Sequence, residues 1–428
     1  MPAAGSAVPA PLDALLQSLV TELRDPPPGR GPGRPAILPA AALWGALVAG
    51  VLTGDLSQVA IWRRIRDPHW WYQGQLQISK EAVYHRLDST GPSPMQAFFT
   101  TVTAHLLARQ ETVPGCAVAP GFREVVALDG STLDAVARRL PSLRAMAPDN
   151  FAVLPGKLTA VFDLRRQLFR RIDWHSSPTQ NDKVGARDAV ADLPAGSLIV
   201  ADLGYFGFRW FDELTDAGQF WVSKYRAKTS LVEIEVLYED GPTRDVIVWL
   251  GAHRADQAQH PVRLIQFEHN GQLRRYLTNV RDPQRLSMRA VAALYARRWD
   301  IELAFKLAKT DLKLHLLWSA KPAVIAHQVW AVLLIAQLVL MLRTTVAVRA
   351  AVADVFMVSV NLLVRYLPPL ALTTGDPIGA FIANGWEMGF LRKSRRIEVA
   401  VPDPPPEAVR SPTVSTGLTR KPRYADKA

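Results

Sequence analysis

The sequence predicts a mixed α/β fold, in which helices flank a mixed sheet and an all-β segment interrupts it. Apolar runs of strand length alternate with helical segments between residues 121 and 216. From residue 220 to residue 279, apolar and polar residues alternate, which is typical of half-buried strands. Before residue 110 and after residue 287, apolar residues recur at helical spacing.

Composition narrows the classes of protein to which this chain can belong. It has 428 residues, enough for two or three domains with a sizeable core, and 49% of them are apolar. The net charge of +11 favours a polyanionic partner, nucleic acid first and an anionic membrane second. The single cysteine, Cys116, excludes an intrachain disulfide and fits a reducing compartment. We interpret it as a packing residue rather than a nucleophile.

The apolar segments favour a soluble protein. Residues 1–11 lack the basic stretch and apolar core of a secretory signal. The most apolar run, Val329–Leu342, is shorter than the roughly 20 residues that cross a bilayer, and Gln337 interrupts it. We therefore predict a buried helix in this run, a cytoplasmic protein and no membrane partner.

The region before the α/β pattern is predicted to be helical. Ser79 can cap a short helix whose polar face carries Lys80, His85 and Arg86. A short basic helix after other short helices favours a helix-turn-helix-like module, although a plain helical bundle fits the pattern nearly as well.

The α/β part is predicted from apolar runs and the turns between them. Strands are expected over residues 122–129, 156–164, 168–175 and 197–202, and helices over 182–192 and 210–216. Their order (three strands, a helix, a strand and a helix) is that of a ribonuclease-H-like mixed sheet. The β-rich segment that follows contains two hairpin signals, Asp240-Gly241 and Asn270-Gly271.

Two aspartates stand where predicted strands end. Asp129 ends the first strand and Asp202 ends the fourth. Buried strands place their C-terminal residues at one edge of a sheet, where sites commonly form. A single carboxylate there is more often a turn former or a helix cap, so the functional interpretation depends on a third acid.

The third acid, Glu302, lies in a helix with an unusual polar stripe. At about 100° per residue, Tyr295, Arg298, Glu302 and Lys309 fall within about 60° of one another, and apolar residues occupy the other side. A solvent-exposed face with salt bridges, such as a pair between Glu302 and Arg298 or Lys306, explains the same periodicity.

Three acids that converge from two strand ends and a helix would bind hard divalent cations. Mg²⁺ prefers oxygen ligands and is typically held by one or two carboxylates together with substrate phosphate, and Mn²⁺ could substitute for it. Two such ions about 4 Å apart activate the attacking oxygen and stabilise the leaving oxygen in a phosphoryl displacement. Basic residues on the same helix face would then meet a DNA backbone.

The spacing Tyr295-x2-Arg298-x3-Glu302-x6-Lys309 resembles the YREK signature of a large bacterial insertion-sequence family of DDE transposases, insertion-sequence family four. The resemblance extends over roughly residues 125–340 and includes Asp129-Gly130-Ser131 and Asp202. The separation 302 − 202 = 100 residues leaves room for the β insertion that this family carries between its second Asp and its Glu.

The resemblance implies a ribonuclease-H-like fold and a function in DNA transposition. It assigns Asp129, Asp202 and Glu302 as catalytic ligands of two Mg²⁺ ions, and Tyr295, Arg298 and Lys309 as DNA contacts. Members cleave double-stranded DNA at the terminal inverted repeats of their element, often through a hairpin, and join the freed end to target DNA as homodimers.

Some members stack a flipped base on a tryptophan, but no Trp stands just before Tyr295. Trp221 and Trp249 lie further back in the insertion, so the hairpin step is not assigned.

The sequence leaves other interpretations of these acids and of the function open. The remaining acids of the α/β part are interpreted as caps and surface pairs, with Asp182 as an alternative ligand; they are Asp134, Asp163, Asp173 and Asp182.

The chain could also be a ribonuclease-H-like nuclease that does not join DNA, or an inactive copy that only binds DNA. A membrane-surface protein is the most remote of these alternatives.

We divide the chain into seven segments on these patterns. They are a flexible basic arm (1–36), a helical DNA-binding-like domain (37–118), the first part of the catalytic domain (119–218), a β-strand insertion (219–280), the second part of the catalytic domain (281–350), a C-terminal helical region (351–400) and a disordered basic tail (401–428).

Overall fold

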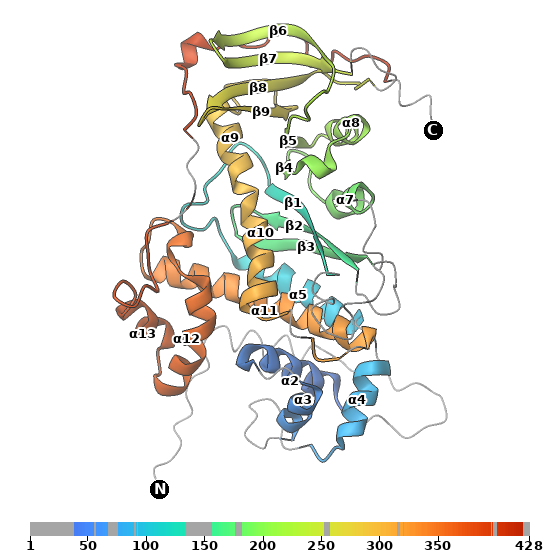
Figure 1. Cartoon of the computed structure of the whole chain (residues 1–428), viewed down its shortest axis with the longest axis vertical. Coiled ribbons are helices and arrows are strands. Elements are labelled where there is room, and N and C mark those ends of the chain that lie inside the picture. Colours follow the sequence, from blue (N-terminus) through green and yellow to red (C-terminus); the bar gives the residue numbers. More distant parts are fainter. Residues whose placement is uncertain are drawn as a thin grey trace.

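A computed structural model of the chain shows a mixed α/β architecture, which confirms the predicted fold class (Figure 1). It describes residues 38–54, 57–66, 76–89, 91, 93–133, 156–175, 182–251, 257–314, 317–319, 321–394, 396 and 400–422. The expected basic arm and Asp134 lie outside these residues.

One sheet of nine described strands runs through the molecule in the order β3-β2-β1-β4-β5-β9-β8-β7-β6. The strands are β1 (Val125–Thr132), β2 (Lys157–Asp163), β3 (Leu168–His175), β4 (Leu198–Ala201), β5 (Phe220–Lys224), β6 (Leu231–Asp240), β7 (Thr243–Leu250), β8 (Val262–His269) and β9 (Gln272–Thr278). Strands β1, β4 and β5 are parallel to one another, and the other pairs are antiparallel.

Helices lie on both faces of this sheet and below it in Figure 1. They are α2 (Ala40–Thr53), α3 (Gln58–Ile65), α4 (Lys80–Ser89), α5 (Ser93–Arg109), α7 (Asp182–Val190), α8 (Phe208–Asp216), α9 (Met288–Arg297), α10 (Trp299–Lys306), α11 (Pro322–Arg349), α12 (Val360–Thr373) and α13 (Pro377–Ala383). Four short segments complete the list, namely the 3₁₀ turns η2 (Leu203–Tyr205), η4 (Val355–Met357) and η5 (Pro406–Ala408) and the π-helical turn η3 (Leu307–Asp311).

The two faces of β1 belong to different hydrophobic clusters, because successive side chains of a strand point to opposite sides. Val125 and Ala127 face the cluster that includes α5, α9, α10 and α11. Val126 and Leu128 face the cluster that includes α7 and α8. The central strands are therefore buried on both sides, which explains their nearly continuous apolar sequence.

The strand β5 was expected to belong to the β insertion, but it pairs in parallel with β4 as the fifth strand of the central sheet. Its other edge pairs with β9, so the four strands β6 to β9 extend the same sheet instead of forming a separate one. Both predicted hairpin turns are present, between β6 and β7 and between β8 and β9.

Helix α11 contains the most apolar run and is long and apolar enough to cross a membrane, but 78% of its most apolar window is buried inside the protein. The interrupting residue, Gln337, is fully buried. Its amide accepts a hydrogen bond from the Phe169 N–H (3.0 Å) and donates one to the Phe169 carbonyl (2.7 Å) on the edge strand β3. Gln337 thus provides hydrogen-bond partners for backbone groups of the edge strand β3 inside the core. The predicted buried helix is confirmed.

The N-terminal helices share the core of α11 with the sheet. Helices α2, α4 and α5 pack against α11, and Trp44 and Phe99 contribute to the same apolar cluster as the sheet. Ser79 caps α4 as predicted, because its hydroxyl accepts the Ala82 N–H (3.2 Å).

Residues 401–422 differ from the disorder expected for the C-terminal tail. The Glu235 carboxylate on the edge strand β6 accepts the N–H groups of Thr413 (2.9 Å) and Val414 (3.1 Å). The Arg410 N–H also bonds to the Leu237 carbonyl of β6 (2.9 Å). The tail covers an edge that would otherwise present unpaired backbone groups, which is the physical reason for its order.

A buried ion pair joins the outer part of the sheet to the start of α9. Arg263 on β8 and Asp245 on β7 are 0% and 1% exposed, and their side chains approach to 2.5 Å. Arg263 also donates to the Leu286 carbonyl (2.5 Å), directly before α9.

We expect Asp245→Asn to lower the free energy of unfolding by about 3 kcal/mol, because it leaves the buried Arg263 charge without its counter-ion. Urea unfolding measures the change. Glu233→Gln is the matched control, since it breaks the exposed pair with Arg244 on the neighbouring strands and should cost less than about 1 kcal/mol. Equal losses for the two variants would contradict the role given to the buried pair.

Candidate functional site

The two strand-end aspartates lie side by side because their strands are parallel neighbours. Leu128 of β1 is in register with Ala201 of β4, and Asp129 and Asp202 follow these two residues. Adjacent strands are about 4.8 Å apart, so the two carboxylates meet at the same edge of the sheet. The strand β1 does not end at Asp129 as predicted but continues to Thr132, since it stays paired with β2.

The third acid reaches this edge from the helical segment that crosses it. Helix α9 ends at Arg297, Arg298 links it to α10, and Glu302 lies in the first turn of α10. At the junction the Arg298 N–H bonds to the Tyr295 carbonyl three residues back (3.2 Å), which is a tighter turn than in an α-helix.

The Arg298 guanidinium lies among the three carboxylates. Its Nη2 is 2.8 Å from Glu302 Oε1, its Nη1 is 3.4 Å from Asp129 Oδ2, and its Nε is 3.8 Å from Asp202 Oδ1. The Arg298 side chain is only 7% exposed, whereas Asp202 is 44% exposed. One buried cation therefore meets three acids from three elements, and Asp202 is the member most open to solvent.

The other members of the polar stripe also face this edge. The Tyr295 hydroxyl donates to Asp202 Oδ1 (3.1 Å). The Lys309 ammonium donates to the Ser131 hydroxyl and to the Thr132 carbonyl (3.3 Å). The predicted stripe is thus directed at the sheet edge instead of forming a solvent-exposed face.

The pKa values of the site reflect burial and crowding of charge. Burial raises the pKa of Asp129 to about 6, and the like charges of Glu302 and Asp202 add to this, whereas the Gly130 N–H and Arg298 oppose it. Burial and the adjacent Asp202 carboxylate raise the pKa of Tyr295, so its hydroxyl keeps its proton. Burial lowers the pKa of Arg298, but Asp202 and the other acids outweigh it and the net change is upward.

The donor set has the chemistry of a hard-cation site, since it consists of carboxylate oxygens on a partly open edge. In the part of the chain that the structure describes, no three His, Cys, Asp or Glu side chains are grouped closely enough to hold a metal ion as they stand. Arg298 accounts for this spacing, because its guanidinium lies among the three acids. A divalent cation would have to replace Arg298 as their shared counter-ion.

The remaining acids with described side chains have structural roles, as predicted. The Asp163 carboxylate accepts the N–H groups of Arg165 (2.8 Å) and Arg166 (2.7 Å) and caps the turn between β2 and β3. Asp173 pairs with Arg171 (2.8 Å). Asp182 begins α7, but its side chain lies outside the described part of the structure, so its candidacy as a ligand stays a prediction.

A buried network behind the site was missed at the level of sequence. Asp300, only two residues before Glu302, points into the core and pairs with Arg297 (2.8 Å). It also accepts a hydrogen bond from Gln167 (2.8 Å), and Arg297 contacts the Cys116 sulfur (3.1 Å). This network fixes the back of the α9–α10 segment, and Cys116, which was expected only to fill space, is buried and takes part in the network through its sulfur. Asp300 must lie on a different helix face from Glu302, because residues two apart in a helix do not face the same way. This spacing is the only sign of the network in the sequence.

The three tryptophans Trp221, Trp249 and Trp299 differ in whether their rings are exposed enough to stack on a nucleotide base. Trp221 is 1% exposed and stacks on Phe211 with ring centroids 3.9 Å apart, so it is closed to a ligand. The Arg420 guanidinium covers the Trp249 ring at 4.5 Å. Trp299, beside Arg298, is 58% exposed.

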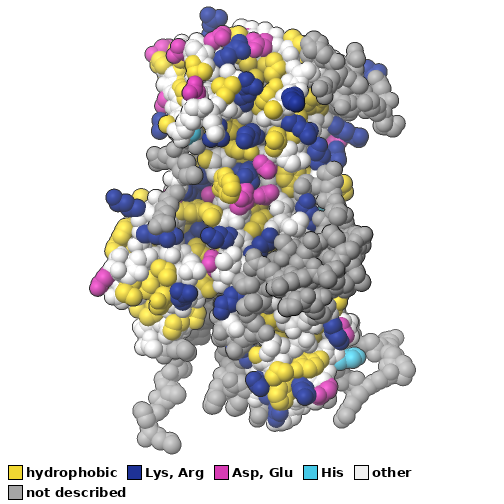
Figure 2. All heavy atoms as spheres, viewed as in Figure 1, with side chains coloured by type: hydrophobic (Ala, Val, Ile, Leu, Met, Phe, Trp, Pro, Cys, Tyr) yellow, Lys and Arg dark blue, Asp and Glu magenta, His cyan; other side chains and the backbone are white. Residues whose placement is uncertain are grey.

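The surface around the site carries mixed charge. Figure 2 shows a small group of acidic side chains near the middle of one face, with basic side chains above and below it. An acidic centre within a basic surface suits a polyanion whose reacting group must meet cations held by carboxylates.

Comparisons with known proteins indicate the family of this chain. A family profile described as "Transposase DDE domain" matches residues 120–338, which span β1 to α11. A protein of Sinorhizobium fredii named "Putative transposase y4zB" is 27% identical over 190 residues, which cover 42% of this chain. The chain spans about half of that relative, 52% of its length.

We expect Arg298→Ala to lower the free energy of unfolding by about 2 kcal/mol in EDTA, because three carboxylates lose their shared counter-ion. Added MgCl₂ should restore part of this loss, since a cation that binds only the folded state stabilises it. Urea unfolding with and without Mg²⁺ measures both effects, and Arg365→Ala, an exposed arginine on α12, is the control. A Mg²⁺ effect no larger than in the wild type would count against a cation site.

Proposed function

The chain belongs to the transposase DDE domain family, and from this premise we propose that it cleaves DNA at the ends of a mobile element and joins them to target DNA. The observation that carries the proposal is the convergence of Asp129 in β1, Asp202 directly after β4 and Glu302 in α10 on one buried guanidinium. Transposition-related cleavage and transfer is the reaction class of the family.

Asp129, Asp202 and Glu302 would hold two Mg²⁺ ions. The bound ions supply activation of the attacking oxygen and stabilisation of the leaving oxygen in an in-line displacement at phosphorus. Asp202 and Glu302 suit a role on the substrate side because they are the more exposed acids, while the partly buried Asp129 is 18% exposed.

The remaining polar residues of the site would orient the DNA strand. Arg298 keeps the acids together in the absence of a cation and would turn to a phosphate when cations take its place. Lys309, whose ammonium lies over Ser131 at the end of β1, would contact a neighbouring phosphate. Tyr295 would hold Asp202 through its protonated hydroxyl.

Finer assignments follow from the YREK spacing. We infer that the chain is a member of insertion-sequence family four that acts as a homodimer on two terminal inverted repeats, in the cytoplasm. A hairpin step is left unassigned, because Trp221 is buried and Trp249 is covered.

We expect Asp129→Asn, Asp202→Asn and Glu302→Gln each to reduce cleavage of a supercoiled plasmid carrying the element's ends by more than a hundredfold or so, with DNA binding retained. Removal of a metal ligand should reduce cleavage more than removal of a residue that only orients a ligand, which typically costs about 10- to 100-fold. Asp192→Asn is the matched control, since this exposed carboxylate pairs with Arg170 and Arg171 away from the site.

The products of that assay separate the alternatives. Cleavage without any joined product identifies a nuclease. A Glu302→Gln protein equal to the wild type in every assay identifies a copy that only binds DNA. Cleavage that survives one of the three substitutions removes that residue from the site.

We expect Lys309→Ala to weaken binding of end DNA and to reduce the slope of log affinity against log salt by about 1, as for the loss of one phosphate contact. Fluorescence anisotropy at several salt concentrations measures the slope. The control is Arg365→Ala, and an unchanged slope for Lys309→Ala would show that its ammonium does not reach a phosphate.

A further inference from the structure

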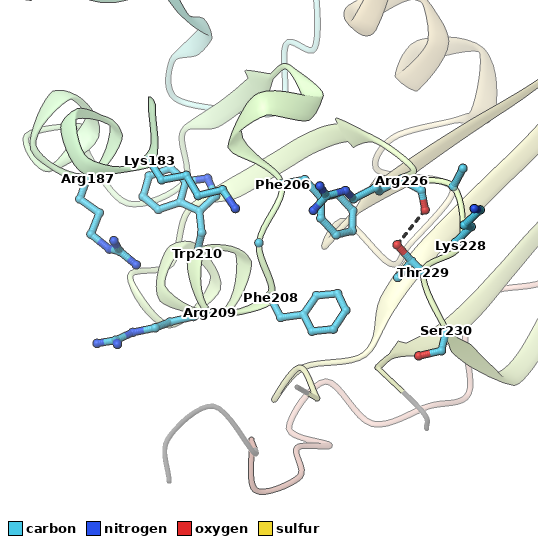
Figure 3. A pocket seen from close by; sticks show the side chains of 12 residues that line it. Lys183, Arg187, Phe206, Phe208, Arg209, Trp210, Arg226, Lys228, Thr229 and Ser230 are labelled. Carbon is cyan, nitrogen blue, oxygen red and sulfur yellow. Dashed lines mark hydrogen bonds between the residues drawn. The ribbon is translucent and has the colours of Figure 1, made fainter. Parts of the chain in front are cut away.

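A basic pocket lies at the same edge of the sheet as the acids, between α7, the start of α8 and the loop after β5. We call it the α7–α8 pocket. It has a volume of about 530 Å³ and lies outside the cluster of acids (Figure 3). Such a volume is that of a small-ligand site, with room for one or two nucleotides but not for a duplex.

The pocket is lined by basic side chains and by no acid. Arg226 and Lys228 come from the loop after β5, and Lys183 comes from α7. Arg226 and Lys228 are exposed, and within the described residues neither forms an ion pair with a carboxylate. Figure 3 shows Lys183 and Arg226 extending toward one another from opposite sides of the pocket.

These cations also repel one another. Burial lowers the pKa of Lys183, and the positive charges of Arg226 and Arg187 lower it further. An anion in the pocket would relieve this repulsion, so the charge pattern indicates a ligand with one or more phosphates.

Aromatic rings line the same space. Phe208, at the start of α8, is partly exposed, and its ring projects into the pocket in Figure 3. Phe206 packs against Phe208 in an edge-on contact, with ring centroids 6.0 Å apart. Rings next to cations suit an unpaired nucleotide, whose base stacks while its phosphate binds a positive charge.

The pocket is close to the acids along the chain. Phe206 follows Asp202 by four residues, so their Cα atoms are at most about 14 Å apart. An unpaired strand can extend further than the roughly 3.4 Å rise per nucleotide of a duplex, so about four nucleotides or fewer bridge this distance.

We propose that the α7–α8 pocket binds an unpaired stretch of the DNA strand that leaves the acid cluster, with phosphates on Arg226 and Lys228 and a base on Phe208. The proposal rests on the proposed function, because that function brings DNA to Asp202. It gives the protein a preference for end DNA with a single-stranded extension over a blunt end.

Anisotropy with labelled end duplexes tests this preference in the full-length Glu302→Gln protein, which keeps the DNA uncut. The duplexes are blunt or carry an extension of about six nucleotides. We expect the extension to tighten binding about tenfold, and Phe208→Ala to remove most of this gain. Arg226→Ala/Lys228→Ala should do the same and reduce the salt slope by about 1.4, for two contacts to a single strand.

Arg109→Ala/Arg365→Ala removes two exposed charges outside the pocket and is the matched control. Lys228→Glu, a single exposed change, repeats the test if the double variant unfolds. Equal weakening on blunt and extended DNA, or no preference in the parent protein, would overturn the proposal. Cleavage by the wild-type protein is scored separately, so a preference without cleavage refutes only the proposed function.

Discussion

The contact of the Arg298 guanidinium with three carboxylates is the interaction on which the site depends. Three acids at one sheet edge repel one another. Burial and the neighbouring acids raise the pKa of Asp129 to about 6. Arg298 offsets this repulsion from within the cluster. The same position makes Arg298 the group that a cation would have to displace in order to bind the three acids.

The fold holds this guanidinium in place from behind. Asp300 pairs with Arg297 on the core side of the helical segment, and Arg263 links Leu286, two residues before α9, to the outer sheet. Buried polar groups of this kind fix one arrangement because each alternative leaves a charge without a partner. The long apolar helix α11 supports the sheet from the same side, and Gln337 satisfies the edge of β3.

The basic residues of this chain fall into two groups with different roles, and the net charge of +11 does not distinguish them. Arg263, Arg297 and Arg298 are buried and pair with acids, so they contribute to structure and to the balance of charge in the site. Arg226 and Lys228 are exposed at the α7–α8 pocket, where no acid lines the wall. A polyanion in this pocket would therefore meet its cations beside the acids, at a distance that a few nucleotides can bridge.

The meeting of Asp129, Asp202 and Glu302 was predicted only through the resemblance to the YREK signature. The sequence by itself determined the α/β class, the order of the central elements and the buried nature of the apolar run. Local periodicity and strand-end positions carry that information, because they depend on neighbours in the chain. Only the tertiary structure decided that Arg298 lies among the acids, that Asp300 turns into the core, that β5 joins the central sheet and that residues 401–422 cover β6. These depend on which distant groups meet, since a charge is paired and a strand edge is covered only by partners that folding brings together.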